Sequence, residues 1–167
     1  MPTGTSSASA RSTGPLSEDL PPEPGDAEAI TRLVDEVFRL ADALAREGDA
    51  IVAPFELSAA RWLILGALQD GPLSMAAIAR RRGLTRQSVR ESAARLERSG
   101  LLVREPDPAD ARAPLLRLTR QGEATLREIE PARRRWAQQA ADGLADGDID
   151  AAVELLRQLR GRFPSPS

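Results

Sequence analysis

A glycine between two short amphipathic segments is the feature that most constrains the fold of this chain. The stretch LSMAAIARRRGLTRQSVRESAARLERSG contains Gly83, whose lack of a side chain permits backbone angles that other residues avoid. Ser74 and Thr85 can cap the helices on either side, because their hydroxyl oxygens accept hydrogen bonds from free amides in a first helical turn. The pattern predicts two short helices joined by a tight turn.

A two-stranded ribbon is predicted directly after the second helix. Gly100 is a typical residue at a helix end, and the short apolar runs at 101–104 and 115–118 are typical of strands. The segment between them, EPDPADARAP, contains too much Pro and Asp for a strand. Its single basic residue, Arg112, is expected near the tip of the ribbon.

Two helices, a glycine turn and a projecting ribbon together indicate a winged helix-turn-helix, which places its second helix in the major groove of DNA. At about 100° per residue, one side of the second helix is apolar and is expected to face the core. It carries Val89, Ala93 and Leu96. The opposite, outward side carries Gln87, Arg90, Glu91 and Ala94.

The residue types on the outward side suit DNA recognition. Gln87 can pair bidentately with adenine and Arg90 with guanine, whereas Ser and Thr reach phosphates or bases. The free amides of the first turn also favour phosphate. The alternative is that Arg86 and Arg90 are solvated surface residues only. The candidate DNA-binding residues of this helix are Thr85, Arg86, Gln87, Ser88 and Arg90.

The ribbon adds two further candidates. A lone arginine on a projecting ribbon suits a narrow minor groove, where the negative potential is strongest, so Arg112 is predicted to bind there. Asp110, two residues earlier, either orients that arginine or forms a turn through its own side chain.

Composition restricts the chemistry that is available to the chain. The 167 residues include no Cys and no His, so disulfides, thiol redox sensing and the usual zinc and haem sites are not expected, and we expect no cofactor. The basic residues are all Arg and are unevenly distributed. Residues 58–119 carry 11 Arg and 6 acidic residues, whereas residues 1–57 carry 4 and 11. The basic part thus coincides with the predicted DNA-binding segment.

Helices are also predicted on both sides of that segment. Residues 1–25 are polar and rich in Pro, Gly and Ser, and we expect them to be a disordered tail in front of one domain at 26–167. Apolar residues recur at helical spacing over 27–48, where the stripe packs either on the domain's own core or on a partner helix. Ser58 is a predicted N-cap of a helix that ends near Gln69.

The last third of the chain predicts two more amphipathic helices, at 120–143 and 149–162, separated by Asp146-Gly147-Asp148. Pro131 lies inside the first of them and predicts a bend, because proline removes one helical hydrogen bond. The apolar stripes at both ends exceed what the winged lobe at 58–119 needs for its own core. We therefore expect 27–48 and 120–163 to form a dimerisation layer.

Two other classes of protein are disfavoured. No stretch approaches the roughly 20 apolar residues of a membrane span, so we expect a soluble, cytoplasmic protein. An enzyme has little support, because no paired constellation of carboxylates, Ser or Thr is visible. A winged-helix module for protein interaction, without specific DNA readout, remains the alternative to a DNA-binding regulator.

The phrases LSAARWLILGAL, IARRRGLTRQSV, RLERSGLLVREPDPADAR and LLRLTRQG, in this order, resemble the MarR family of transcriptional regulators over residues 27–162. The resemblance implies a homodimer on a palindromic operator and repression that is relieved by a small phenolic or lipophilic molecule. That molecule is implied to bind between the dimer layer and the DNA-binding lobe, nearest Phe38, Trp62 and Leu65. The alternative for these three residues is ordinary core packing.

The resemblance implies that residues 85–88 and Arg90 match the positions at which the recognition helix of MarR proteins contacts DNA. It implies likewise that Arg112 matches the wing arginine that enters the minor groove. One departure concerns Arg82, which occupies a place that is usually apolar. Because it shares a face with Ile78, its head must find a phosphate or an acidic partner, or its stem must snorkel. The absence of Cys excludes the thiol-based, peroxide-sensing branch of the family.

Overall fold

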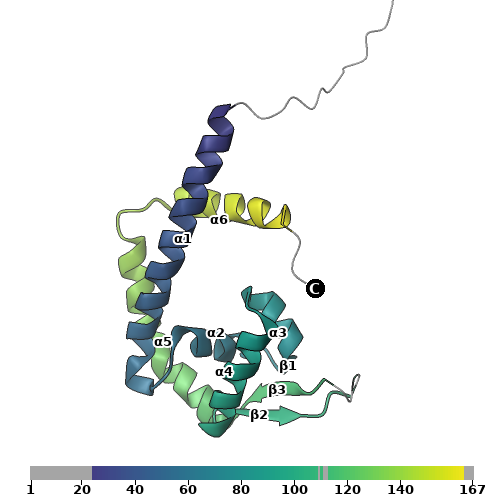
Figure 1. Ribbon diagram of the computed structural model, residues 1–167. Helices are drawn as coiled ribbons and strands as arrows, with labels where there is room; N and C mark the ends of the chain where they lie inside the picture. The colour runs from purple at the N-terminus through teal and green to yellow at the C-terminus, as the bar shows by residue number, and fades with distance from the viewer. Residues whose placement is uncertain (1–23, 109, 111–112, 164–167) are drawn as a thin grey trace, which may run out of the picture. The chain divides into compact units, whose positions relative to one another are not determined.

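The computed structural model describes residues 24–108, 110 and 113–163. The predicted tail at 1–25 therefore lies almost entirely outside the described residues, as does Arg112. The chain divides into two compact units at residue 39, and helix α1 (Pro24–Val52) belongs to both. The second unit continues as follows (Figure 1): η1 (Ala53–Phe55), α2 (Ala59–Ala67), β1 (Leu73–Ser74), α3 (Met75–Arg82), α4 (Arg86–Arg98), β2 (Leu102–Glu105), β3 (Leu115–Leu118), α5 (Arg120–Ala141) and α6 (Asp146–Gly161).

The mainly α fold with a small β-wing is confirmed, and so are the predicted helix caps. Ser74 Oγ accepts from the amide of Ala77 at 3.2 Å, and Thr85 Oγ1 accepts from the amide of Ser88 at 3.1 Å. Gly83 lies between the two helices with a φ of 66°, in the left-handed region that favours glycine. Ser58 likewise caps α2.

The sequence predicts that the first helix ends at Gly48, but the helix continues to Val52. Gly48 is buried, and a Cβ on it would lie 2.9 Å from Cβ of Ala59. The glycine therefore allows close packing at the start of α2 and does not break the helix. The turn that follows η1 places Glu56 in the left-handed region, with a φ of 55°.

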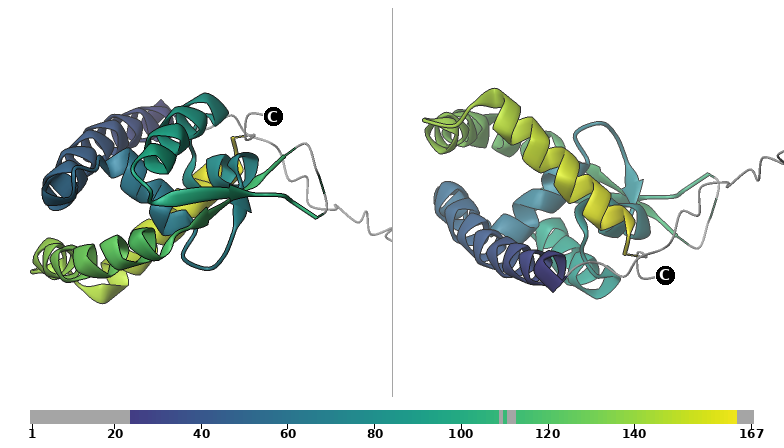
Figure 2. Two further views of the ribbon diagram at one scale, coloured as in Figure 1. Left: turned by 90° about the horizontal axis from the view of Figure 1, so that it is seen from below. Right: turned by 90° about the horizontal axis from the view of Figure 1, so that it is seen from above.

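The wing belongs to a three-stranded antiparallel sheet with the order β1-β3-β2. Strand β2 is shifted by one residue from the predicted 101–104, and β3 is confirmed at 115–118. Strand β1 was not predicted, because two residues carry no visible periodicity. Figure 2 shows β2 and β3 leading away from the helices as a ribbon.

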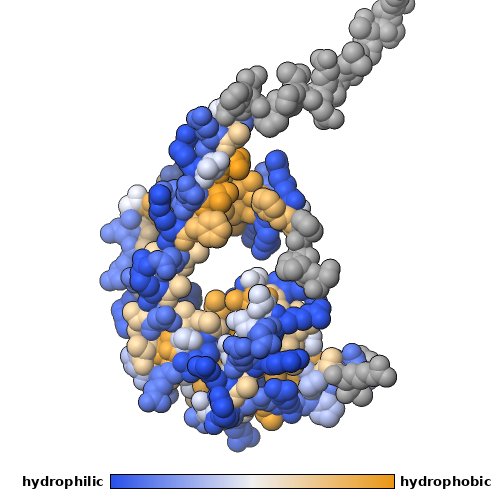
Figure 3. Space-filling model, viewed as in Figure 1, coloured by the Kyte–Doolittle hydropathy of each residue, from blue (hydrophilic) through white to orange (hydrophobic). Residues whose placement is uncertain are grey.

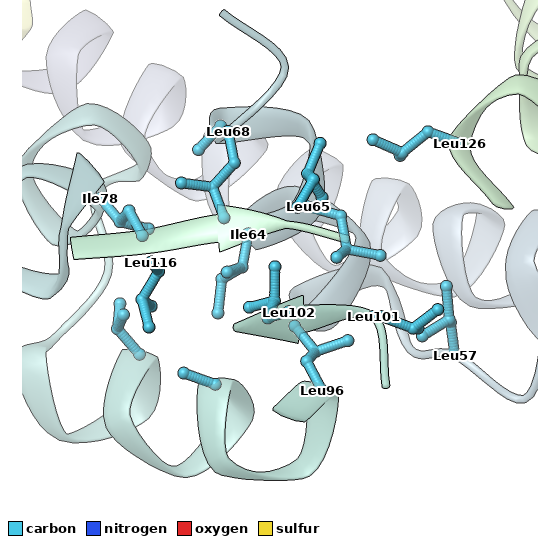
Figure 4. Packing of buried hydrophobic residues seen from close by; sticks show 14 of the residues in the cluster. Leu57, Ile64, Leu65, Leu68, Ile78, Leu96, Leu101, Leu102, Leu116 and Leu126 are labelled. Atoms are coloured by element: carbon cyan, nitrogen blue, oxygen red, sulfur yellow. The ribbon is translucent and has the colours of Figure 1, made fainter. Parts of the chain in front are cut away.

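The core of the second unit lies between α2, α3 and α4 and the sheet. Ile64 and Leu65 from α2 are fully buried, as are Ile78, Leu96 and Leu116 from the surrounding elements, and the labelled side chains converge between helices and strands (Figure 4). The predicted inward side of α4 is confirmed, since Val89, Ala93 and Leu96 have no exposed surface. Burial of such side chains is worth about 1.5–3 kcal/mol each, so the core holds α4 in a fixed orientation.

The C-terminal helices were predicted at nearly the observed positions. The break falls at 142–145 and not at Asp146-Gly147-Asp148, because Asp146 and Asp148 lie in the first turn of α6, where the helix dipole favours acidic residues. Helix α5 continues through Pro131 for ten more residues, and the bend there stays a prediction. Within the described residues no single helix is long and apolar enough to cross a membrane; α1 and α2 meet that criterion only together, across an 81° bend.

Large apolar side chains remain on the surface of two helices. Figure 3 shows them on α1 and again on α6, which has no buried residue. On α1 they are Ile30, Val34, Val37, Phe38, Leu40 and Leu44. On α6 they are Ile149, Val153, Leu155 and Leu156. Each set recurs at helical spacing, so each helix has an apolar stripe that is not covered by a core.

Candidate nucleic-acid interface

The first two turns of α4 form the exposed part of the helix-turn-helix. Arg86, Gln87 and Arg90 are exposed, as the sequence predicts, and Glu91 is exposed beside them. Gln87 Nε2 donates a hydrogen bond to Glu91 Oε1 at 2.7 Å, one helical turn further on. The outward side of α4 therefore combines two arginines with a hydrogen-bonded amide and carboxylate.

Thr85 and Ser88 have more local roles in the structure. The Thr85 hydroxyl is used as the N-cap acceptor for the Ser88 amide, and the Ser88 side chain is half-buried. A capped helix start keeps its remaining amides directed outward, where they can bind an anionic group. Thr85 and Ser88 thus lie next to Gln87 at the exposed end of the helix.

An ion pair that was not predicted joins the wing to α4. Arg104 on β2 donates to Glu97 through Nε and Nη2, at 2.7 and 2.9 Å. These hydrogen bonds raise the pKa of Arg104. The Glu97 side chain is 24% exposed and the Arg104 side chain 41%, so water screens the pair only in part. No periodicity in the sequence reveals such a pair, since it joins two elements across a turn.

A second ion pair joins the two strands of the ribbon, since Arg117 Nε on β3 lies 2.8 Å from Glu105 Oε2 on β2. At the far end of the ribbon, Asp110 is exposed and its backbone takes part in a turn, with its amide donating to Asp107 O and its carbonyl accepting from Ala113. Both roles considered for the Asp110 side chain, orienting Arg112 or forming a turn, stay predictions. Arg112 lies outside the described residues.

Arg82 is half-buried, and within the described part of the chain it makes no hydrogen bond to an acidic side chain. Its Nε is buried without a hydrogen-bond acceptor among the described residues, and Nη2 would lie 3.1 Å from a Cβ placed on Gly66 of α2. Burial lowers the pKa of its guanidinium, the neighbouring Arg81 adds to this, and Asp70 acts in the opposite direction. Arg81, by contrast, donates to Asp70 at 2.5 Å and to the carbonyl of Ala67 at 3.2 Å.

The three predicted effector-contacting residues have different environments. Leu65 is fully buried in the core, Trp62 is half-buried against it, and Phe38, in the first unit, is 71% exposed. For Leu65 the core-packing alternative agrees with its burial. Trp62 and Leu65 belong to the second unit, so the shared site with Phe38 stays a prediction.

The second unit instead contains an open groove of about 800 Å³ that the sequence did not reveal. Leu68, Leu118 and Leu126 supply apolar surface at the groove, which lies between the segment that follows α2, strand β3 and helix α5. Gln69, Gly71 and Pro72 also line it, together with six charged side chains. They are Arg117, Glu123, Arg127, Glu130, Arg133 and Arg134. Such a groove can accept an apolar ring that carries an anionic group.

A family model and several known proteins are similar to this chain. The model of the MarR family matches residues 55–113. An uncharacterised protein of Mycobacterium tuberculosis is 33% identical over 133 residues, which cover 80% of this chain and 93% of that protein. The transcriptional repressor NicR of Pseudomonas putida is 30% identical over 105 residues, which cover 62% of this chain and 66% of NicR.

A solved structure shares the fold over most of the chain. It is that of BpsR from Bordetella bronchiseptica, whose DNA binding is regulated by 6-hydroxynicotinic acid. The match has a TM-score of 0.67 and 26% sequence identity, and it covers 89% of this chain and 98% of BpsR.

Proposed function

The chain belongs to the MarR family of winged helix-turn-helix transcriptional regulators, and we propose that it is a homodimeric repressor of a palindromic operator, released by a small molecule. The observation that carries the proposal is the exposed start of α4. This turn is capped by Thr85, α4 packs on the buried apolar core through its opposite side, and Gln87 and Arg90 are exposed to solvent.

Readout of the operator divides between base edges and phosphates. Gln87 and Arg90 have the donors and acceptors that adenine and guanine require in the major groove. Thr85, Arg86 and Ser88 lie where free helix amides and hydroxyls bind a phosphate. Arg112, with Asp110 beside it in the sequence, is the wing candidate for the minor groove.

The apolar stripes of α1 and α6 support the dimer. A stable interface typically buries about 1,600 Å² in total, and its centre is apolar. Two copies that bury these stripes would hold two recognition helices at a fixed spacing, as a palindromic operator requires. The regions involved are those expected from the sequence, 27–48 and 120–163.

Titration of the protein against the DNA upstream of its own gene tests the DNA-binding proposal. We expect binding about a thousandfold tighter than to scrambled duplex of equal length, with a logarithmic salt slope of about 0.9 per phosphate contact. Equal affinity for both duplexes at moderate salt would contradict specific readout. NicR, the relative described as a repressor, supports testing for repression with a reporter fused to the same upstream DNA.

For the effector we propose an aromatic carboxylic acid. The groove beside Arg117 and Arg127 offers apolar surface together with positive charge, and the similar protein BpsR responds to 6-hydroxynicotinic acid, which has that chemistry. The site predicted from the sequence, nearest Phe38, Trp62 and Leu65, is the second candidate.

The two candidate sites can be separated with that acid as the probe. If the groove binds it, Arg127→Ala weakens its effect on operator binding at least tenfold, and Trp62→Ala leaves the effect unchanged. The reverse result assigns the effector to Trp62 and its neighbours. If the acid alters operator binding in neither direction at millimolar concentration, the proposed effector class is wrong.

A module for protein interaction remains the alternative function. It requires that the outward side of α4 has lost its role in reading bases. If Gln87→Ala and Arg112→Ala both leave DNA affinity and specificity unchanged, this alternative replaces the repressor.

A further inference from the structure

The outward side of the recognition helix carries a carboxylate at its centre. At about 100° per residue, Glu91 lies on the same side as Gln87 and Ala94, and it is exposed. DNA is a polyanion, so a negative charge in this position weakens binding to any duplex unless a base contact offsets the repulsion. Glu91 lies in the middle of a surface that is otherwise suited to DNA, so we looked for a base that it could bind.

Glu91 is also the residue that holds Gln87. The Gln87 amide donates one N–H to Glu91 Oε1 at 2.7 Å, which leaves its second N–H as a donor and its Oε1 as an acceptor. These are the two groups that adenine needs, because its major-groove edge presents the N7 acceptor and the N6 amino donor. The contact therefore orients Gln87 without using up its capacity to read a base.

We propose that Glu91 is a specificity-determining residue that accepts a hydrogen bond from the exocyclic amino group of cytosine in the major groove. The proposal rests on the proposed DNA-binding function. A carboxylate can only accept, and cytosine presents only a donor, its N4 amino group. In adenine the N6 donor lies beside the N7 acceptor, and guanine and thymine present the acceptors N7, O6 and O4, which repel a carboxylate. Because an ionised carboxylate accepts several hydrogen bonds, Glu91 binds Gln87 and the base together.

The spacing of the two side chains fixes where the base must lie. Residues four apart on a helix are roughly 5–6 Å apart, and successive base pairs are separated by about 3.4 Å. Gln87 and Glu91 therefore read positions one or two base pairs apart in each half-site. The expected signature is an adenine near a cytosine, with the cytosine under the control of Glu91.

Selection of binding sites from random duplex by the full-length protein tests this assignment, with Glu91→Gln and Glu91→Ala compared with the wild type. We expect Glu91→Gln to move the preference at one position of each half-site from cytosine towards adenine, which Gln pairs with. Glu91→Ala is expected to remove the preference there. Both variants should bind random duplex severalfold more tightly, since a repulsive charge is gone. Their preference for the wild-type operator over random duplex should fall about tenfold.

Glu128→Gln is the matched control, since it removes one exposed carboxylate from α5 instead of α4. It should keep the wild-type base preferences. If Glu91→Gln and Glu91→Ala keep the selected sequence and the specificity ratio of a wild type that binds specifically, Glu91 only stabilises the helix, and the inference is overturned while the proposed function stands. If the wild type itself selects no sequence, both are overturned.

Discussion

Arg82 shows how a single residue departs from the expected pattern of its helix. Its guanidinium packs over Gly66, and its buried Nε has no acceptor among the described residues. A buried donor without a partner typically costs about 1–3 kcal/mol. The neighbouring Arg81 has both an ion pair and a backbone acceptor, so two adjacent arginines differ in their expected effect on stability.

We therefore expect Arg82→Leu to raise the free energy of unfolding by about 1 kcal/mol, because it removes the unsatisfied donor and restores an apolar side chain. Arg81→Leu should lower it by a similar amount. Urea denaturation measures both. If Arg82→Leu instead destabilises the protein as much as Arg81→Leu does, the Arg82 guanidinium makes a net favourable contact and the prediction is wrong.

Among the elements, the wing and the recognition helix are coupled by the pair Glu97–Arg104. A bidentate arginine–carboxylate contact has defined geometry, and this one is partly shielded from water. It ties the base of the ribbon to α4, and we expect it to set the direction of the wing relative to this proposed recognition helix.

A double-mutant cycle with Glu97→Gln and Arg104→Gln should give a coupling energy of about 1 kcal/mol, together with faster amide exchange along β2. The cycle for Glu105 and Arg117, a more exposed pair within the ribbon, is the control and should give a smaller coupling. Coupling energies near zero for both cycles would show that the wing is held by strand pairing alone.

Helix α5 has a pH-dependent contact next to Pro131. Hydrogen bonds lower the pKa of the Glu130 carboxyl from 4.5 to about 2, and the bond from Arg133 has a larger effect than the bond from Arg134. A lowered carboxyl pKa adds stability that is complete above pH 4.5 and is lost as the pH falls towards 2. The wild type should therefore exceed Glu130→Gln in melting temperature at neutral pH, and the two should converge near pH 2. A constant difference at all pH values would contradict this assignment.

At the scale of the molecule, the apolar stripes of α1 and α6 belong to no core in the described chain. If the dimer covers them, Val153→Asp together with Leu156→Asp should yield a monomer in sedimentation equilibrium, because two charges would be buried at an apolar interface. Gln158→Ala, on the opposite side of α6, should remain a dimer. An unchanged dimer in the double variant would place the interface elsewhere.

How much the sequence predicts depends on the range of the contact involved. The caps Ser74 and Thr85 and the inward side of α4 follow from local periodicity and were correctly predicted. Gly48 was read as a helix end, because a sequence does not distinguish a breaking glycine from one that packs against Ala59. The pair Glu97–Arg104 and the groove beside α5 join separate elements, so no local pattern indicates them.

The specificity ratio of the Gln87→Ala variant tests the proposed function most directly. It compares the affinity for the selected operator with that for scrambled duplex at one moderate salt concentration. Loss of a bidentate base contact should lower the ratio at least tenfold and leave binding to scrambled duplex unchanged. A ratio equal to that of the wild type would contradict recognition through the outward side of α4.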